Sequence, residues 1–279
     1  MRHRPFGPLD RDVSSIGQGT WYIDHGDRAA AVKALQAGLD AGMSHIDTAE
    51  MYGEAEPVVA EAIAGRRDEV FLVSKVLPSN ASRKGVIAAC ERSLKRLNTD
   101  RLDCYLLHWR GQVPLAETVA AFEDLKSAGK IASWGVSNFD ADDLNELWRL
   151  AGPGAIACNQ VLYHLQERAI EHRVIPWCAQ HDVAVVAYSP FGHNDFPSAR
   201  SPAGAVLQRI AAVHEVSPRQ VALAFLTRQP AVFAIPKAST VAHATDNAAA
   251  GQLALSDAEL AELDRTFPRG REPASLPML

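Results

Sequence analysis

Four residues of this 279-residue chain carry the side chains of an acid–base site, and three of them end short apolar runs. Asp47, Lys75 and His108 end those runs, and Tyr52 follows Asp47 by five positions. A free tyrosine is a poor acid at neutral pH because its pKa is about 10. A nearby ammonium lowers that pKa, so Lys75, held by Asp47, would prepare Tyr52 to protonate a carbonyl oxygen. His108 would orient that carbonyl by a hydrogen bond.

Each of these residues also has an ordinary structural explanation. Asp47 and Lys75 could form a structural ion pair, Tyr52 could pack at the start of a helix, and His108 could be a core histidine. Their joint occurrence after neighbouring strands favours catalysis. The group contains no nucleophile–base pair, so acyl transfer is not indicated. No H-E-x-x-H motif occurs, and no metal site is predicted.

The segments that must position these residues alternate between short β-rich runs and longer amphipathic stretches. The expected strands lie at 15–18, 44–47, 70–75, 102–108, 131–137, 155–160, 183–189 and 232–237. The expected helices lie at 28–41, 54–64, 82–97, 115–128, 142–150, 171–181 and 218–228.

Eight strands that alternate with helices at a nearly constant period predict a parallel (β/α)8 TIM barrel. We expect residues 1–279 to form this one domain. Residues 3–8 and 11–14 predict an N-terminal β-hairpin that closes the amino-terminal mouth of the barrel. Residues 191–204 are rich in Gly, Pro and Ser and predict a functional loop. The strand ends of a barrel converge on one rim, where active sites form.

The composition excludes several classes of partner. The net charge is −5, so there is no basic surplus for binding nucleic acid. No run reaches the roughly 18 apolar residues of a membrane span. The four cysteines form no C-x-x-C pair, which favours buried free thiols in a reducing cytoplasm. We expect a cytoplasmic, monomeric barrel that acts on a small molecule, with no nucleic-acid or membrane partner.

The strand ends also carry motifs that resemble the aldo-keto reductase family over roughly residues 4–265. Any dinucleotide must bind without a Rossmann fingerprint, because Gly17-Gln18-Gly19-Thr20-Trp21-Tyr22 has no third glycine. The motifs that carry the resemblance are Gly19-Thr20-Trp21, Ile46-Asp47-Thr48-Ala49 with Tyr52-Gly53, Ser74-Lys75, Asp103 through His108, Gly135-Val136-Ser137-Asn138-Phe139, Asn159-Gln160, Tyr188-Ser189-Pro190 and Ile235-Pro236-Lys237-Ala238.

This resemblance implies an NADPH-dependent reductase of aldehydes and ketones with an Asp/Tyr/Lys/His tetrad. Tyr52 would be the general acid and base, Lys75 and Asp47 would tune it, and His108 would position the substrate. Tyr188 would stack on the nicotinamide, and Ser137, Asn138 and Gln160 would hydrogen-bond its carboxamide. The expected cofactor-binding residues from the first seven strand ends are Gly19, Thr20, Trp21, Asp47, Ser137, Asn138, Gln160, Tyr188, Ser189, Pro190, Phe191 and Gly192.

The remaining cofactor residues follow the last strand. On the resemblance, Lys237, Ser239 and Thr240 meet the 2′-phosphate of NADPH, and Asp246 and Asn247 meet the adenine. His243 stands where the family often has an arginine, and an imidazole grips a phosphate less well than a guanidinium. We therefore expect NADPH to be preferred over NADH by a narrow margin. The expected cofactor residues here are Ile235, Pro236, Lys237, Ala238, Ser239, Thr240, His243, Asp246 and Asn247.

The expected substrate wall is aromatic. Trp21, Tyr22 and Trp109, together with Tyr52 and His108, would line an apolar pocket for hydrophobic or aromatic carbonyl compounds. Two other functions stay open on the sequence. One is a barrel aldolase or isomerase that uses Lys75 as a Schiff-base nucleophile. The other is a non-catalytic subunit that senses NADPH.

Overall fold

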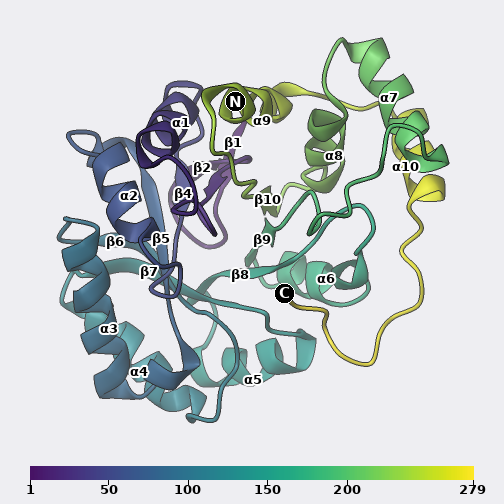
Figure 1. The fold of residues 1–279 in the computed structure, drawn as a ribbon. Coiled ribbons are helices and arrows are strands. Elements are labelled where there is room, and N and C mark those ends of the chain that lie inside the picture. The colour runs from purple at the N-terminus through teal and green to yellow at the C-terminus, as the bar shows by residue number, and fades with distance from the viewer.

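Eight parallel strands form one sheet in sequence order in the computed structural model, which describes all residues 1–279 (Figure 1). Each strand pairs in parallel with its sequence neighbours, as right-handed βα units require. The strands are β3 (Gln18–Gly19), β4 (His45–Asp47), β5 (Phe71–Val76), β6 (Leu102–Leu107), β7 (Ile131–Ser137), β8 (Ile156–Leu162), β9 (Ala184–Tyr188) and β10 (Val232–Ala234).

The first and last strands of this sheet meet, so the sheet closes. Isolated parallel bridges join Ile16 to Ala234 and Gly19 to Lys237. A Cβ on Gly19 would lie 2.5 Å from the carbonyl oxygen of Ile235, so only glycine permits this approach of the two backbones. The predicted (β/α)8 barrel is confirmed.

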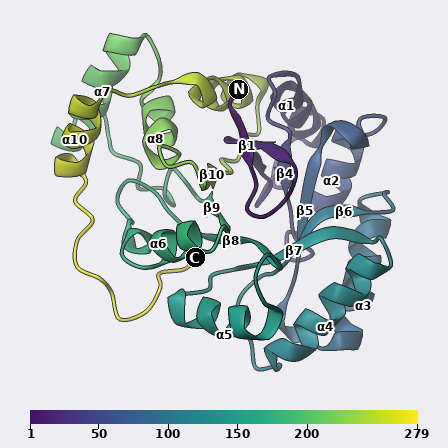
Figure 2. The same ribbon diagram turned by 180° about the vertical axis from the view of Figure 1, so that it is seen from behind.

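Helices surround the strands in both views of the fold (Figures 1 and 2). Seven of them coincide with the expected amphipathic stretches, whereas α7, α9 and α10 were not among the expected helices. Helix α7 begins within the expected loop, because Ser201 caps it and Pro202 occupies its first turn. The helices are α1 (Arg28–Asp40), α2 (Ala55–Ala62), α3 (Arg83–Arg96), α4 (Leu115–Ser127), α5 (Ala141–Ala151), α6 (Val174–Gln180), α7 (Pro202–His214), α8 (Pro218–Leu226), α9 (Val241–Ala249) and α10 (Asp257–Thr266).

An antiparallel hairpin of β1 (His3–Pro5) and β2 (Asp12–Ser14) precedes the barrel, as predicted. Phe6, which follows β1, is fully buried. Its ring packs 4.8 Å from that of Phe71 and 5.0 Å from that of Phe233, measured between centroids. These partners belong to strands of the barrel, so the hairpin closes its amino-terminal mouth.

None of the helices combines the length and the apolar character that crossing a membrane would require. All four cysteines are buried free thiols, as expected. After α10 the chain has no regular structure, and it returns along the outside of the molecule toward β8 and α6 (Figures 1 and 2). Its last residue, Leu279, donates its backbone N–H to the Tyr188 hydroxyl at 3.3 Å. The tail therefore reaches the carboxyl-terminal rim of the barrel.

His45 gives the barrel a pH-dependent stability. Its ring is fully buried, packs edge-on against Phe6 and Phe71, and offers neither nitrogen a hydrogen-bond partner. Burial, together with the charge of Lys75, lowers the pKa of His45 from 6.5 to about 3. The unfolded chain therefore binds a proton that the folded chain does not. This contribution to stability is complete above the unfolded pKa and is lost as the pH falls toward the folded pKa.

We expect His45 to lower the free energy of unfolding by about 1.4 kcal/mol for each pH unit below pH 6. In His45→Leu this part of the pH dependence of the unfolding free energy should disappear. Urea denaturation of both proteins at about pH 7, 6 and 5 measures the difference, and other buried histidines cancel in the comparison. Equal pH slopes in the two proteins would show that His45 is not held neutral.

Candidate active site

The carboxyl-terminal rim brings the four acid–base residues together. Asp47 ends β4, Lys75 lies near the end of β5, and His108 directly follows β6. Tyr52 lies in the loop between β4 and α2. The Lys75 ammonium lies 2.5 Å from an Asp47 carboxylate oxygen and 3.4 Å from the Tyr52 hydroxyl. That hydroxyl lies 3.5 Å from Nε2 of His108. The side chains therefore meet as the sequence predicts.

Lys75 is a charged ammonium in this group. Burial alone would lower its pKa, but the Asp47 carboxylate and the Tyr52 hydroxyl raise it above the usual lysine value. The ammonium also donates to the carbonyl oxygen of Thr48 at 2.9 Å. Burial raises the pKa of Asp47, while Lys75 and the Gln160 amide favour its ionised form. A lysine that stays charged is a poor Schiff-base nucleophile.

The pKa of Tyr52 departs from the sequence-based expectation. Burial of the hydroxyl raises this pKa above 10, and Asp47 adds to the rise. Lys75 acts in the expected direction and lowers the pKa, but its effect is smaller than that of burial. The expectation of a net decrease was wrong, since a linear sequence does not show how completely loops cover a side chain. Tyr52 consequently holds its proton at neutral pH.

His108 is neutral in this site. Burial, reinforced by the charge of Lys75, lowers its pKa to about 2. Its Nε2 faces the Tyr52 hydroxyl, and its Nδ1 has no hydrogen-bond partner in the protein. A neutral imidazole can orient a polar substrate by a hydrogen bond without adding a second positive charge.

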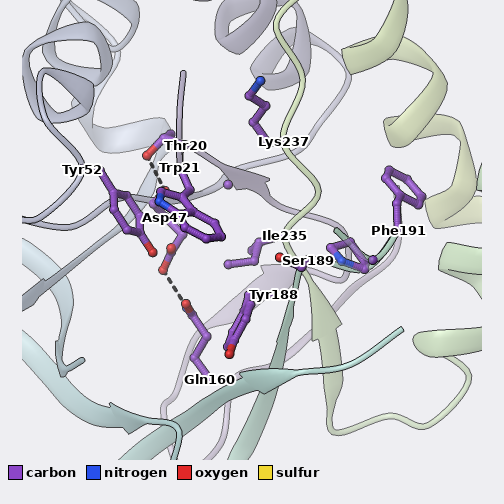
Figure 3. A pocket seen from close by; sticks show the side chains of 13 residues that line it. Thr20, Trp21, Asp47, Tyr52, Gln160, Tyr188, Ser189, Phe191, Ile235 and Lys237 are labelled. Carbon is purple, nitrogen blue, oxygen red and sulfur yellow. Dashed lines mark hydrogen bonds between the residues drawn. The ribbon is translucent and has the colours of Figure 1, made fainter. Parts of the chain in front are cut away.

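A chain of hydrogen bonds joins the expected carboxamide-binding residues to the acid–base group. The Tyr188 hydroxyl donates to the Asn138 side chain at 2.9 Å, and the Asn138 amide donates to Ser137 Oγ at 3.2 Å. The Ser137 hydroxyl donates to the backbone carbonyl oxygen of Gln160 at 2.8 Å. The Gln160 amide then donates to Asp47 at 2.7 Å (Figure 3). The network fixes the orientation of the amide groups beside Asp47.

A hollow of about 210 Å³ opens beside this network. Figure 3 shows Tyr52 and Asp47 across the hollow from Phe191, with Lys237 on the segment after β10. All of its lining residues were predicted site residues. They are Gly19, Thr20, Trp21, Asp47, Tyr52, Gln160, Tyr188, Ser189, Pro190, Phe191, Gly192, Ile235 and Lys237.

A smaller hollow of about 40 Å³ adjoins the first one, with which it shares Trp21, Tyr52, Gln160 and Tyr188. Met51 and Leu279 line it and were missed from the sequence, Leu279 because only the fold of the tail brings it to the rim. Tyr22 was predicted to line the substrate pocket, but it is exposed, stacks on Trp21 and lines neither of these two hollows. The lining residues are Trp21, Met51, Tyr52, His108, Trp109, Ser137, Asn138, Gln160, Tyr188 and Leu279.

A third hollow of about 620 Å³ extends the first one, with which it shares Phe191, Gly192 and Lys237. Ser239 and Thr240 do not line it, and the Thr240 hydroxyl caps α9. Asn194, Phe196 and Arg219 were missed from the sequence. The lining residues are Phe191, Gly192, Asn194, Phe196, Arg219, Lys237, His243, Asp246 and Asn247.

The two connected hollows fit an extended dinucleotide. Between them the backbone makes a tight turn, in which the Gly192 N–H donates to the Ser189 carbonyl oxygen at 2.8 Å. Ser189 and Gly192 both have left-handed φ values, +47° and +75°. The two ends of the turn are small residues, and left-handed backbone of this kind suits the close approach of a pyrophosphate. Lys237 offers an exposed cation where a terminal phosphate would lie.

Comparisons with known proteins agree with this geometry. Residues 15–267 match the sequence model of the Aldo/keto reductase family. Methylglyoxal reductase YeaE of Escherichia coli (strain K12) is 49% identical over 97% of this chain and 96% of its own length. An NADH-specific methylglyoxal reductase of the same organism is 31% identical over 68% of this chain and 67% of its own. A Klebsiella pneumoniae aldo-keto reductase solved with NADPH is 46% identical, with a TM-score of 0.93 and full coverage of both chains.

Proposed function

The chain belongs to the aldo/keto reductase family, and from this premise we propose that it is an NADPH-dependent reductase of small 2-oxoaldehydes such as methylglyoxal. The main support for carbonyl reduction with a tyrosine as the acid is the buried Asp47–Lys75 pair. Lys75 of this pair contacts the Tyr52 hydroxyl beside the first hollow. The named activity of the 49% identical relative supports the substrate class. The small volume beside His108 and Trp109 also favours a compact carbonyl compound over an aromatic one.

When bound, NADPH supplies the hydride that the carbonyl carbon accepts. Tyr52 donates its proton to the carbonyl oxygen and so completes the alcohol. Lys75 lies 3.4 Å from the Tyr52 hydroxyl and stabilises the phenolate that this transfer leaves. Asp47 keeps Lys75 in place, and neutral His108 holds the carbonyl oxygen toward Tyr52. Tyr188, Asn138 and Gln160 would hold the nicotinamide end of the cofactor.

The other two functions fit the site less well. A Schiff-base enzyme needs a neutral amine, and Lys75 is a buried, ion-paired ammonium. A subunit that only senses NADPH has no need of the acid–base group. We propose further that residues 1–279 act as one barrel domain, as a monomer in the cytoplasm.

Purified protein mixed with NADPH and methylglyoxal tests the proposal through the loss of absorbance of the reduced nicotinamide. We expect steady consumption with methylglyoxal and a kcat/KM at least about tenfold lower with a bulky aromatic aldehyde. No consumption with any carbonyl compound would overturn the reductase function. Faster turnover of the aromatic aldehyde would overturn the substrate class alone. Borohydride trapping of a covalent adduct on Lys75 would favour the aldolase alternative.

A further inference from the structure

The third hollow collects positive charge that the protein does not neutralise. Arg219 and Lys237 are exposed cationic residues of its lining, which the exposed His243 side chain also joins. Arg219 and Lys237 take part in none of the ion pairs of the structure. The one carboxylate of the lining is Asp246. The two cations of the lining are therefore not ion-paired with any carboxylate of the protein.

Asp246 is already bound by neutral donors. Its two carboxylate oxygens accept hydrogen bonds from the Ser217 hydroxyl at 2.8 Å and from the Gln220 side-chain amide at 2.7 Å. These contacts hold the start of α8 against α9. Asp246 forms no ion pair with Arg219 in the structure, although both line the same hollow, and its hydrogen bonds turn it toward α8.

Arg219 is positioned by aromatic rings rather than by a carboxylate. Its guanidinium carbon lies 5.6 Å from the centroid of the Phe191 ring and 5.1 Å from that of Phe196. The two rings meet edge to face, with centroids 5.8 Å apart. Stacking on rings leaves the N–H groups at the edge of a guanidinium free to donate. Arg219 is thus held at the hollow with its donors available to a ligand.

Two helices add to the positive potential here. Arg219 lies in the first turn of α8, and His243 lies in the first turn of α9. The amino-terminal end of a helix carries a partial positive charge. Together with the Lys237 ammonium, these groups surround the hollow with the electrostatics that suit a phosphate dianion. A guanidinium adds bidentate hydrogen bonding, which an ammonium or an imidazole lacks.

We propose that Arg219 is a cofactor-specificity residue that binds the 2′-phosphate of NADPH. This inference rests on the proposed function, because it takes the hollow shared by Phe191, Gly192 and Lys237 as the far end of the cofactor site. Arg219 then supplies from α8 the guanidinium that position 243 lacks. The preference for NADPH over NADH is consequently wider than the sequence indicates.

Equilibrium titrations with NADPH, NADH and 2′,5′-ADP test this role without relying on turnover. In Arg219→Gln we expect NADPH and 2′,5′-ADP to bind about 10- to 100-fold more weakly. This fold-change corresponds to the loss of one hydrogen bond to a charged group. NADH binding should change by less than about twofold. Arg219→Lys should recover only part of the lost NADPH affinity, since a lysine restores the charge but not the bidentate hydrogen bonding of a guanidinium.

Arg209→Gln is the matched control, because Arg209 is also an exposed arginine, but it lies on α7 and pairs with Glu262. It should leave all three dissociation constants unchanged. Unchanged NADPH binding in Arg219→Gln would overturn the inference and leave the proposed function intact. Equal weakening of NADPH and NADH would also overturn it, because the effect would not then depend on the 2′-phosphate. Failure of the unmodified protein to bind NADPH would overturn the proposed function itself.

Discussion

Tyr52→Phe is expected to lower kcat for carbonyl reduction by about 10²- to 10⁴-fold, the usual contribution of a general acid. NADPH binding should stay within about twofold of the unmodified protein, because the phenyl ring keeps its place beside Trp21. Steady-state turnover and a fluorescence titration of NADPH measure the two quantities separately. Turnover within about twofold of the unmodified protein would show that another group supplies the proton.

Tyr22→Phe is the control for this substitution. Tyr22 is 43% exposed and stacks on Trp21, outside the smaller hollow. Loss of its hydroxyl should leave turnover unchanged. The fold should also tolerate Tyr52→Phe, because Lys75 retains Asp47 and the Thr48 carbonyl oxygen as acceptors. We therefore expect a stability change of no more than about 1 kcal/mol.

Lys75→Met is expected to remove both turnover and much of the stability. Lys75 is fully buried, and its ammonium is the only cation that contacts the Asp47 carboxylate. Without it a carboxylate stays buried with the Gln160 amide as its remaining side-chain donor. Breaking a buried ion pair in this way costs about 3–5 kcal/mol. Urea denaturation and steady-state turnover measure the two effects.

The double variant Asp47→Asn/Lys75→Met separates stability from catalysis. It removes both charges and leaves an amide that can still accept from Gln160, so most of the lost stability should return. Turnover should not return, because Tyr52 still lacks the ammonium that stabilises its phenolate. A single Lys75→Met variant as stable as the unmodified protein would contradict the buried ion pair. Recovery of turnover in the double variant would contradict the role of Lys75.

The sequence located the active-site rim because a parallel barrel converts position along the chain into position in space. Every strand runs in the same direction, so each residue that ends a strand lies on one rim. Asp47, Lys75, His108 and Gln160 could therefore be assigned to one site from the strand pattern alone. Tyr52 was placed there by its position five residues after Asp47, whereas Tyr188 and the loop residue Gly192 followed from the resemblance.

The sequence by itself thus determined the barrel and the acid–base group, because these depend on strand periodicity and side-chain type, and its motifs gave the residues of the first hollow through the family resemblance. Tertiary structure decided the net direction of the Tyr52 pKa, since burial depends on how loops cover the hydroxyl. It also decided that Tyr22 faces outward and that Leu279 and Arg219 reach the two adjoining hollows. These contacts join segments that no local pattern relates, and only the packing of the folded chain brings them together.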